Sequence, residues 1–355
     1  MLSMINKTLL PLSWLYGMGV WVRNKLFDWE ILPVEKFDVP VISIGNLAIG
    51  GTGKTPHTEY LIRMLSPKYG VAVLSRGYKR KTRGFVLADG HADNRSIGDE
   101  PYQIYRKFPE IIVAVDSNRR RGIRNLLYAT KSPKPDVILL DDAFQHRYVK
   151  PSFSILLSDS RRPFYEDCLL PAGRLREPAK NVKRADLIIF TKYNNKLRIT
   201  NYELRNYQFP IINSQLAYRS LLPVFPKENS TQKESMERLR EASYSVLLLA
   251  GLASPEDLIR YIEKYTSGLQ TMIYPDHHDF SRKDILKITE NFNRIQNTNK
   301  LIITSEKDAV RLIHNPHIPE EIKDLIYYIP IAVVFEPEQE KLFAQIIENH
   351  VKHFI

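Results

Sequence analysis

Residues 44–61 read IGNLAIGGTGKTPHTEYL, and this stretch decides the fold. It continues a short apolar run and leads into a helix-length segment that begins near Pro56. Its glycines let the backbone turn tightly and point several N–H groups at one place, which makes a cradle for an anion. Lys54 can reach the β- and γ-phosphates of a nucleotide, and the Thr55 hydroxyl can bind Mg²⁺. We expect the cradle to consist of Gly50, Gly51, Thr52, Gly53, Lys54 and Thr55.

One position departs from the usual phosphate-loop pattern G-x-x-x-x-G-K-[ST]. Ala48 stands where that pattern has its first glycine, and this position often adopts a conformation that only glycine tolerates. The strand–loop–helix context and the paired glycines still favour a nucleotide site. The alternative is a glycine-rich turn in which the Lys-Thr pair is incidental.

Short β-branched runs alternate with helix-length segments along residues 31–217. Such nearly continuous apolar strands are buried on both faces, so we expect an α/β fold of the P-loop NTPase type, with a doubly wound parallel sheet. Ligands bind at the carboxyl edge of such a sheet, where several of these runs end in polar residues. The runs are PVISIGN, GVAVLSRG, IIVAVD, DVILLDD, FSILLSD and ADLIIFTK.

A polar, proline-interrupted segment separates this pattern from a second series of strand–helix pairs. We therefore expect four parts along the chain. They are an N-terminal helix in residues 1–30, a phosphate-loop domain in 31–217, a connector in 218–243, and a smaller α/β domain in 244–355 that closes the nucleotide cleft.

A second candidate nucleotide element is PDVILLDDAFQHR, an apolar strand that ends in Asp141 and Asp142. A carboxylate at a strand end beside a phosphate loop can hold Mg²⁺ directly or through water. Neighbouring residues of a strand point to opposite faces, so we expect one aspartate to serve the metal and the other to support it. The sequence leaves open which one does so, and the alternative for the pair is a helix N-cap.

The composition limits the partners without choosing one. A formal net charge of +11 favours a polyanionic partner such as nucleic acid, acidic lipid or a phosphorylated substrate. The single cysteine, Cys168, excludes an internal disulfide framework and a cysteine-based metal site, which fits a reducing cytoplasm.

The N-terminal run LLPLSWLYGMGVWV, residues 9–22, is shorter than the roughly 20 residues that a helix needs to cross a bilayer. The residues after it offer no small-residue cleavage site of a secretory signal. Two interpretations remain. One is an amphipathic helix in a membrane interface, with Trp14, Tyr16 and Trp21 at headgroup depth, and the other is an ordinary core helix.

Eight short motifs occur in order between residue 41 and about residue 312. They are GNLAIGGTGKTP, LSRGY, GDEP, DDAFQHR, PAGRLREP, AGLASP, DHH and SEKDAVRL. In this order they resemble the tetraacyldisaccharide 4'-kinases, the lipid A 4'-kinases of Gram-negative bacteria. The resemblance implies an ATP- and Mg²⁺-dependent enzyme that phosphorylates the 4'-hydroxyl of tetraacyldisaccharide 1-phosphate to give lipid IVA. It also implies a peripheral protein on the cytoplasmic face of the inner membrane; we expect a monomer that binds no nucleic acid.

The resemblance further implies roles for single residues. Asp99 in GDEP looks like the base that takes the proton from the attacking hydroxyl, with His277 in DHH holding it across the cleft and Lys54 on the phosphates. The family usually reads DDGFQHR, and Ala143 here replaces its glycine. Arginine grips phosphate bidentately, and we expect the substrate contacts to come from Arg76, Arg121, Gln145, His146, Arg176 and Glu177.

Two other function classes compete with this interpretation. A P-loop GTPase or metallochaperone of similar fold would read guanine near FTKYN, residues 190–194, but Asn194 offers no carboxylate to the base. A nucleic-acid ATPase rests on the net charge and on the arginine run 119–121, without a nucleic-acid-binding signature.

Overall fold

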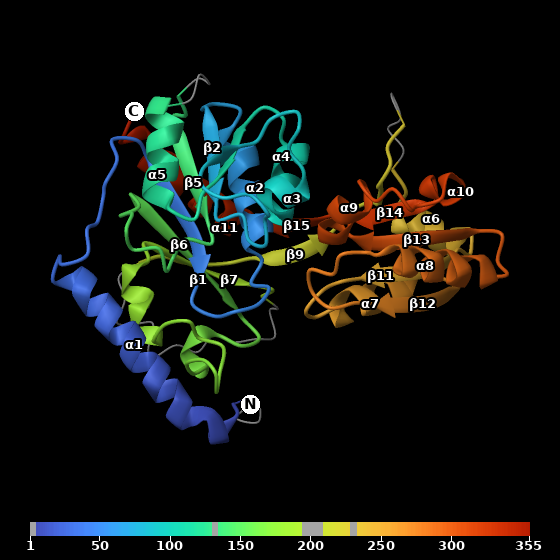
Figure 1. Ribbon diagram of the computed structural model, residues 1–355, viewed down its shortest axis with the longest axis horizontal. Coiled ribbons are helices and arrows are strands. Elements are labelled where there is room, and N and C mark those ends of the chain that lie inside the picture. The colour runs from blue at the N-terminus through green and yellow to red at the C-terminus, as the bar shows by residue number, and fades with distance from the viewer. Residues whose placement is uncertain (1–4, 130–133, 194–208, 228–232) are drawn as a thin grey trace. The chain divides into compact units, whose positions relative to one another are not determined.

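The structure is a computed structural model that describes residues 5–129, 134–193, 209–227 and 233–355. The chain forms two compact units: Met1–Leu216 together with Val333–Ile355, and Ala217–Ala332. Figure 1 shows both units, each built on its own sheet. The predicted α/β class is confirmed.

The first unit contains an eight-stranded sheet in the order β3-β4-β2-β5-β1-β6-β7-β8. All neighbouring strands are parallel except β3, which is antiparallel to β4. The phosphate-loop strand β1 therefore lies in the interior of the sheet. The strands are β1 (Val41–Asn46), β2 (Val71–Ser75), β3 (Val86–Leu87), β4 (Ile112–Val115), β5 (Val137–Asp141), β6 (Phe153–Asp159), β7 (Leu187–Thr191) and β8 (Ile211–Asn213).

Helices cover both faces of this sheet, as a doubly wound fold requires. One face packs against α2 (Lys54–Leu65), α4 (Asp99–Lys107) and α11 (Pro337–Lys352), and the other against α5 (Arg119–Arg124) and the π-helical turn η3 (Asn125–Ala129). Alternation along the strands explains this, because Val71 and Val73 belong to the first core whereas Ala72 and Leu74 belong to the second. The remaining helical elements are η2 (Lys7–Leu9), α3 (Asn94–Ile97), η4 (Phe164–Glu166) and η5 (Ala179–Arg184).

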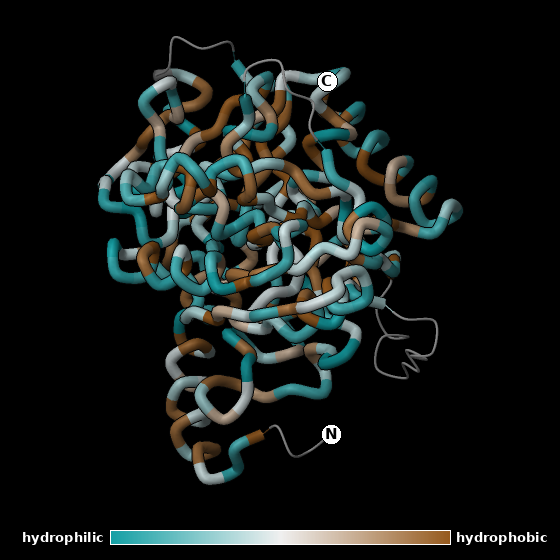
Figure 2. Tube along the Cα trace, turned by 90° about the vertical axis from the view of Figure 1, so that its right-hand side faces the viewer, coloured by the Kyte–Doolittle hydropathy of each residue, from teal (hydrophilic) through white to brown (hydrophobic). Residues whose placement is uncertain are grey.

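The helix α1 (Leu10–Asp28) leaves most of its apolar side chains exposed. Trp14 is 80% exposed and Met18 is 59% exposed, and only Ser13, Asn24 and Phe27 are buried. Figure 2 shows the hydrophobic residues of this helix in brown near the N-terminus. The interpretation as a core helix is therefore wrong. Within the described residues, no helix combines the length and apolar character needed to cross a membrane.

The second unit has a five-stranded sheet in the order β10-β14-β13-β11-β12. One face packs against α8 and α9, and the other packs against α6 and α7. Its elements are β10 (Leu222–Pro223), α6 (Met236–Glu241), β11 (Ser245–Ala250), α7 (Glu256–Ile262), η7 (Glu263–Tyr265), β12 (Gly268–Ile273), α8 (Arg282–Arg294), β13 (Lys300–Ser305), α9 (Glu306–Leu312), α10 (Glu320–Lys323) and β14 (Ile326–Ile329). The chain passes between the units in the paired strands β9 (Gln215–Tyr218) and β15 (Ile331–Val334).

The observed units differ from the predicted division at the C-terminal end. The segment 333–355 belongs to the first unit, although the sequence pattern places it in a domain of residues 244–355. The reason is that Phe343, Ile347 and Val351 on α11 are at most 1% exposed and pack in the core under α2. The expected connector, residues 218–243, lies within the second unit and contributes β10 and α6 to it.

Candidate active site

The loop after β1 has the backbone conformation of a phosphate cradle. Gly50 and Gly53 have φ angles of 109° and 85°, which L side chains rarely adopt. Thr52 is buried, and its hydroxyl accepts a hydrogen bond of 2.8 Å from Asn46 at the end of β1. Gly53 is the N-cap of α2, so the first turn of that helix presents free N–H groups at the loop.

Ala48 does not need the glycine that the usual pattern has there. It has no positive φ and forms an antiparallel bridge with Leu175. The carbonyl of Arg174 accepts from the N–H of Ile49 at 2.8 Å, and the carbonyl of Leu47 accepts from the N–H of Arg176 at 2.7 Å. The segment RLRE therefore lies directly against the start of the phosphate loop.

Lys54 and Arg176 meet at Asp142. Lys54 Nζ lies 3.8 Å from Asp142 Oδ1, and Arg176 Nη1 lies 3.0 Å from the same oxygen. Burial raises the pKa of Asp142, but the two cations outweigh it and hold that pKa below its usual value. The chain thus gathers two positive charges around one ionised carboxylate beside the loop.

Asp142 also explains why Ala143 is tolerated. The positive φ of this turn, 47°, belongs to Asp142, whereas Ala143 has none. Aspartate visits the left-handed region more readily than most residues. The alanine that replaces the family glycine therefore carries no backbone strain.

Asp141 ends β5 and is buried, with 1% of its surface exposed. It lies next to the end of β1, because Asp141 pairs with Ile44 in the parallel register. The Thr58 hydroxyl on α2 is 3.5 Å from Asp141 Oδ1. Burial and the negative charge of Glu100 raise the pKa of Asp141 to about 7. A buried carboxylate of this kind is stabilised when a cation binds to it.

The donor set fits Mg²⁺. This ion takes oxygen ligands, and in nucleotide sites it is commonly held by one or two carboxylates and the phosphates. Asp141 and Asp142 supply carboxylates at the carboxyl end of β5, and Thr55 supplies a hydroxyl in the first turn of α2. The Asp141 carboxylate is 1% exposed and adjoins Asp142 in the sequence, and this burial of acidic groups side by side favours a bound cation at this place.

Lys192 is a phosphate-loop contact that the sequence did not reveal. Its Nζ donates to the carbonyl of Gly51 at 2.7 Å and pairs with Asp159 at 3.0 Å. It follows β7 in the motif FTKYN, so its place at the carboxyl edge of the sheet was the available signal. Asn194, on which the guanine-reading alternative depends, lies outside the described residues.

The arginine run 119–121 divides into three different environments. Arg119 is 2% exposed and donates to the carbonyls of Asp116 and Asp141, at 2.8 Å and 3.3 Å. Arg121, the predicted substrate contact, forms a bidentate pair of 2.8 Å bonds with the buried Asp116. Arg120 stacks over the ring of Tyr148 at 5.2 Å. The guanidinium of Arg121 is therefore bound by Asp116, whereas Arg119 lies beside the aspartate pair.

Glu177, another predicted substrate contact, is also occupied within the chain. It is 1% exposed and accepts a hydrogen bond of 2.6 Å from Asn181, and it pairs with Arg184. The contacts of Glu177 with Asn181 and Arg184 therefore hold the end of the RLRE segment in place.

Gln145 and His146 follow the aspartate pair on the same turn. The Gln145 side chain donates to the carbonyl of Asn46 at 2.7 Å and accepts from Arg176 at 3.3 Å. His146 accepts at Nε2 from the N–H of Arg119 at 3.3 Å. Arg23 on α1 donates to the carbonyl of Gln145 at 2.9 Å, a contact between residues 122 positions apart that no local pattern predicts.

Asp99 is the first residue of α4 and is 9% exposed. The positive φ of Gly98, 96°, sets the sharp entry into that helix. Asn94 donates to Asp99 at 3.4 Å. The carboxylate is therefore positioned by the turn that precedes it.

His277 belongs to the second unit, in the segment between β12 and α8. It has a φ of 62°, and its two ring nitrogens lie 2.9 Å from Lys307 and Arg311. Lys307 lies at Nε2 and Arg311 at Nδ1, so the ring is held between two cationic side chains of α9. The predicted contact between His277 and Asp99 joins two different units and stays a prediction.

A groove of about 1010 Å³ runs between α1 and residues 167–179. Its lining is mainly apolar and includes Trp14, Leu15, Met18, Leu169, Leu175 and Pro178. The hydroxyl of Tyr16, also on α1, donates to the carbonyl of Arg176 at 2.9 Å. The groove therefore borders the segment that contacts the phosphate loop.

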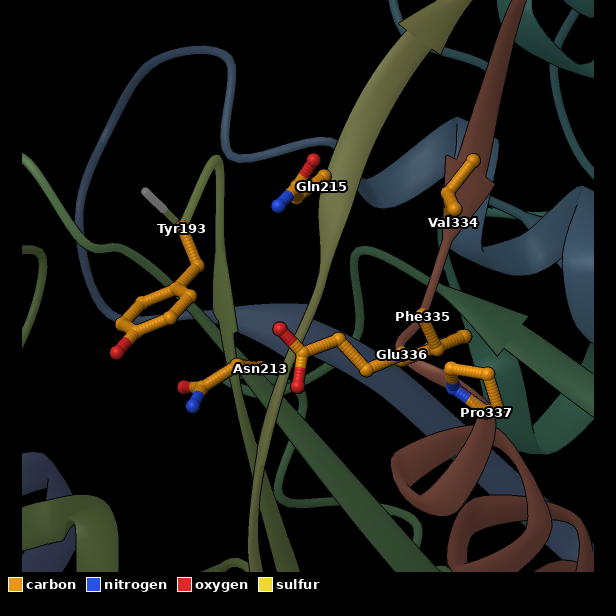
Figure 3. A pocket seen from close by; sticks show the side chains of 7 residues that line it. All are labelled: Tyr193, Asn213, Gln215, Val334, Phe335, Glu336 and Pro337. Atoms are coloured by element: carbon orange, nitrogen blue, oxygen red, sulfur yellow. The ribbon is translucent and has the colours of Figure 1, made fainter. Parts of the chain in front are cut away.

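A smaller cavity of about 240 Å³ is lined by Tyr193, by Asn213 and Gln215, and by residues 334–337. Figure 3 shows Asn213, Gln215 and Glu336 with their polar groups directed toward it, beside the ring of Tyr193. His57 connects this region to the loop, because it contacts the carbonyl of Gly53 at 2.7 Å and the Ser214 hydroxyl at 3.0 Å.

Comparisons with known proteins agree with this geometry. The family model described as tetraacyldisaccharide-1-P 4'-kinase matches residues 5–352. The tetraacyldisaccharide 4'-kinase of Parabacteroides distasonis is 50% identical over 98% of this chain and 95% of its own length. That of Bacteroides thetaiotaomicron is 48% identical over 98% of this chain and 94% of its own.

A solved structure is similar as well. The crystal structure of LpxK from Aquifex aeolicus in complex with ATP superimposes with a TM-score of 0.75 at 28% identity, covering 97% of this chain and 98% of that one. The GTPase alternative is not favoured by any of these relatives. With a nucleotide loop, an adjacent aspartate pair and relatives of this kind along its whole length, the chain belongs to the tetraacyldisaccharide-1-phosphate 4'-kinase family, whose members use ATP with Mg²⁺.

Proposed function

We propose that the centre around Lys54, Asp142 and Arg176 transfers the γ-phosphoryl group of ATP to the 4'-hydroxyl of tetraacyldisaccharide 1-phosphate. The observation that carries this proposal is the convergence of Lys54 and Arg176 on Asp142, 3.8 Å and 3.0 Å away, beside the phosphate loop. A loose transition state spreads negative charge over the transferred group, and preorganised cations stabilise that charge.

Each residue in the centre has a task in this proposal. The N–H groups of the loop and Lys54 hold the β- and γ-phosphates. Arg176, which lies 3.0 Å from Asp142, would supply a second positive charge to the transferred group. Mg²⁺, held by Thr55 and the aspartate pair, would neutralise phosphate charge. Asp99 receives the proton of the 4'-hydroxyl, and His277 orients Asp99.

The surroundings suit a lipid acceptor at a membrane surface. The groove beside α1 would take the acyl chains, since its lining is apolar and it borders Arg176 through Tyr16. The exposed tryptophan and methionine side chains of α1 would lie in the interface. We place the enzyme on the cytoplasmic face of a Gram-negative inner membrane, as a monomer.

The test is to incubate the protein with Mg-ATP and detergent-dispersed tetraacyldisaccharide 1-phosphate and to look for a bisphosphorylated product. Lys54→Ala and Asp142→Ala should each lower turnover by about 100-fold or more, as removal of a transition-state charge partner does. Lys68→Ala is the matched control, because Lys68 forms an exposed pair with Glu348 in the same unit. Near-normal turnover in the first two variants would refute the proposal, and GTP hydrolysis without lipid would favour the GTPase alternative.

A further inference from the structure

A cluster of polar side chains lies at the carboxyl edge of the second unit's sheet, around His277. Gly251 follows β11, Ser305 ends β13, and His277 lies in the segment after β12; these three strands are parallel neighbours. His277 has a φ of 62°, a value that only a few per cent of residues other than glycine adopt. Such a backbone conformation persists only where the surroundings hold it, and the contacts that do so come from α9.

Asp308 on α9 anchors this cluster. Its side chain is fully buried, and its Oδ2 accepts from the N–H of Gly251 at 2.9 Å and from the Ser305 hydroxyl at 2.6 Å. Arg311, one turn further along α9, lies 3.5 Å from Oδ1. A Cβ at Gly251 would lie 2.7 Å from that same oxygen, so the backbone approaches the carboxylate as closely as only glycine permits. The carboxylate therefore has a fixed place under Arg311.

Arg311 connects Asp308 to the ring of His277. It is 7% exposed, and its guanidinium donates to the carbonyl of His278 at 3.1 Å and lies 2.9 Å from Nδ1 of His277. A guanidinium has donors but no acceptor, and it stays protonated in proteins. The contact therefore requires Nδ1 to accept, which leaves the ring proton of a neutral imidazole on Nε2.

Lys307 makes the opposite demand, because its Nζ lies 2.9 Å from Nε2 of the same ring. A neutral imidazole has one acceptor nitrogen, and a protonated imidazole has none and would add a third positive charge. Lys307 keeps a second partner, Asp276 at 2.8 Å, and Asp276 also lies 3.9 Å from Nε2. A buried Arg311 without its acceptor would leave a donor unsatisfied, at a cost of about 1 to 3 kcal/mol. The demand of Arg311 therefore prevails.

We propose that Arg311, anchored by Asp308, is a positioning residue that fixes His277 in the tautomer with its proton on Nε2. This inference rests on the proposed function and deepens it, since it names the atom through which His277 acts. A carboxylate such as that of Asp99 only accepts hydrogen bonds, so a histidine that orients it must donate. With Nδ1 bound to Arg311, the donor is the Nε2–H of a neutral ring.

Nitrogen NMR of histidine-labelled protein measures the tautomer directly. The spectra are recorded at about pH 8, where ordinary histidines are neutral, and His277→Gln assigns the signals. The unchanged protein should carry the proton on Nε2. Arg311→Met removes the donors at Nδ1, so Lys307 donates to Nε2 and the proton should move to Nδ1. Lys307→Met removes the competing donor and should leave the proton on Nε2.

Turnover of Mg-ATP with tetraacyldisaccharide 1-phosphate shows whether the reaction depends on this tautomer. Arg311→Met should lower kcat by about 10- to 100-fold, the equivalent of one hydrogen bond to a charged group. KM for ATP should stay the same, because the phosphate loop belongs to the first unit. Arg311→Lys keeps a donor for Nδ1 and should restore most of kcat. The matched control is Arg260→Met, the same change at an exposed arginine of the second unit, and it should leave kcat unchanged.

The double variant Arg311→Met with Asp308→Asn replaces Arg311→Met if the single change unfolds the protein, because it removes both buried charges together. A moved proton together with a lowered kcat supports the inference. A proton on Nδ1 in the unchanged protein, a proton that stays on Nε2 without Arg311, or a moved proton with normal kcat would overturn it. If the unchanged protein gives no bisphosphorylated product, the proposed function alone fails, and the spectra still decide the role of Arg311.

Discussion

At the scale of the residue, Glu59 links the helix of the phosphate loop to the helix that begins with Asp99. It lies on α2 and is 1% exposed. Gln103 and Lys107 on α4 donate to it at 2.8 Å and 2.6 Å, and Arg63 on its own helix lies at 3.1 Å. Its single negative charge therefore compensates two cations inside the protein.

Glu59→Gln should destabilise the first unit by about 3 kcal/mol, because breaking a buried ion pair leaves charge uncompensated. This loss of stability is at the low end of the roughly 3 to 5 kcal/mol that breaking a buried ion pair costs, because Arg63 reaches solvent. Urea denaturation measures it. Arg260→Gln, in an exposed pair with Asp257, is the control and should change stability by less than about 1 kcal/mol. Similar small effects in both variants would show that the Glu59 cluster contributes little.

The lowered pKa of His146 leads to a prediction of how the stability of the protein depends on pH. Its pKa of about 4 in the folded protein lies below the value of 6.5 for an ordinary histidine. As pH falls from 6.5 toward 4, the unfolded chain binds a proton that the folded chain does not, so stability falls by up to about 1.4 kcal/mol per pH unit. His146→Gln keeps an acceptor and removes the titration. Denaturation at a series of pH values should therefore show a smaller loss in the variant, and parallel curves would contradict a lowered pKa of His146 in the folded protein.

At the scale of the element, α1 combines polar contacts to the rest of the first unit with exposed apolar side chains. Ser13 and Tyr16 donate to the carbonyls of Leu169 and Arg176, both at 2.9 Å, and fix the helix to the loops beside the site. Most of its apolar side chains, Trp14 among them, are exposed. The element is thus held by polar contacts while its apolar surface stays available.

The double change Trp14→Gln and Met18→Gln should weaken binding to anionic vesicles by about 10-fold or more, since each buried apolar side chain contributes roughly 1.5 to 3 kcal/mol. Stability should change little, because Trp14 is 80% and Met18 is 59% exposed. Sedimentation with vesicles and thermal unfolding measure the two effects. The control is Leu286→Gln on α8, which is 55% exposed and belongs to the second unit. Unchanged sedimentation would rule out a membrane contact of α1.

At the scale of the whole molecule, the chain returns to its first unit after completing the second. Ile347 on α11 is fully buried against the first sheet, whereas Leu342 on the same helix is 40% exposed. The C-terminal segment therefore stabilises the unit that carries the phosphate loop.

Ile347→Ala should destabilise the first unit by about 2 to 5 kcal/mol, the usual cost of removing a large buried side chain. Leu342→Ala should cost less than about 1 kcal/mol. Hydrogen exchange read separately for β1 and β11 should show faster exchange in β1 alone. Faster exchange in β11 instead would mean that α11 supports the second unit, as the predicted division of residues 244–355 had it.

The sequence by itself determined the phosphate loop, the parallel sheet and the aspartate pair at its edge. These features depend on neighbouring residues: glycines that permit positive φ, apolar runs that form buried strands, and polar residues where strands end. The roles of the single site residues, the membrane contact and the closing of the cleft stay predictions.

Only the tertiary structure decided which side chains reach the site and where the chain's last helix packs. Arg121 is taken by Asp116 while Arg119 lies beside Asp141, although the two arginines differ by two positions. Arg23 donates to the carbonyl of Gln145. The helix α11 packs in the core of the first unit, although the residues of the second unit separate it in sequence from the rest of that core. Such contacts join residues far apart in sequence, and a local pattern carries no information about the partner that folding brings to each of them.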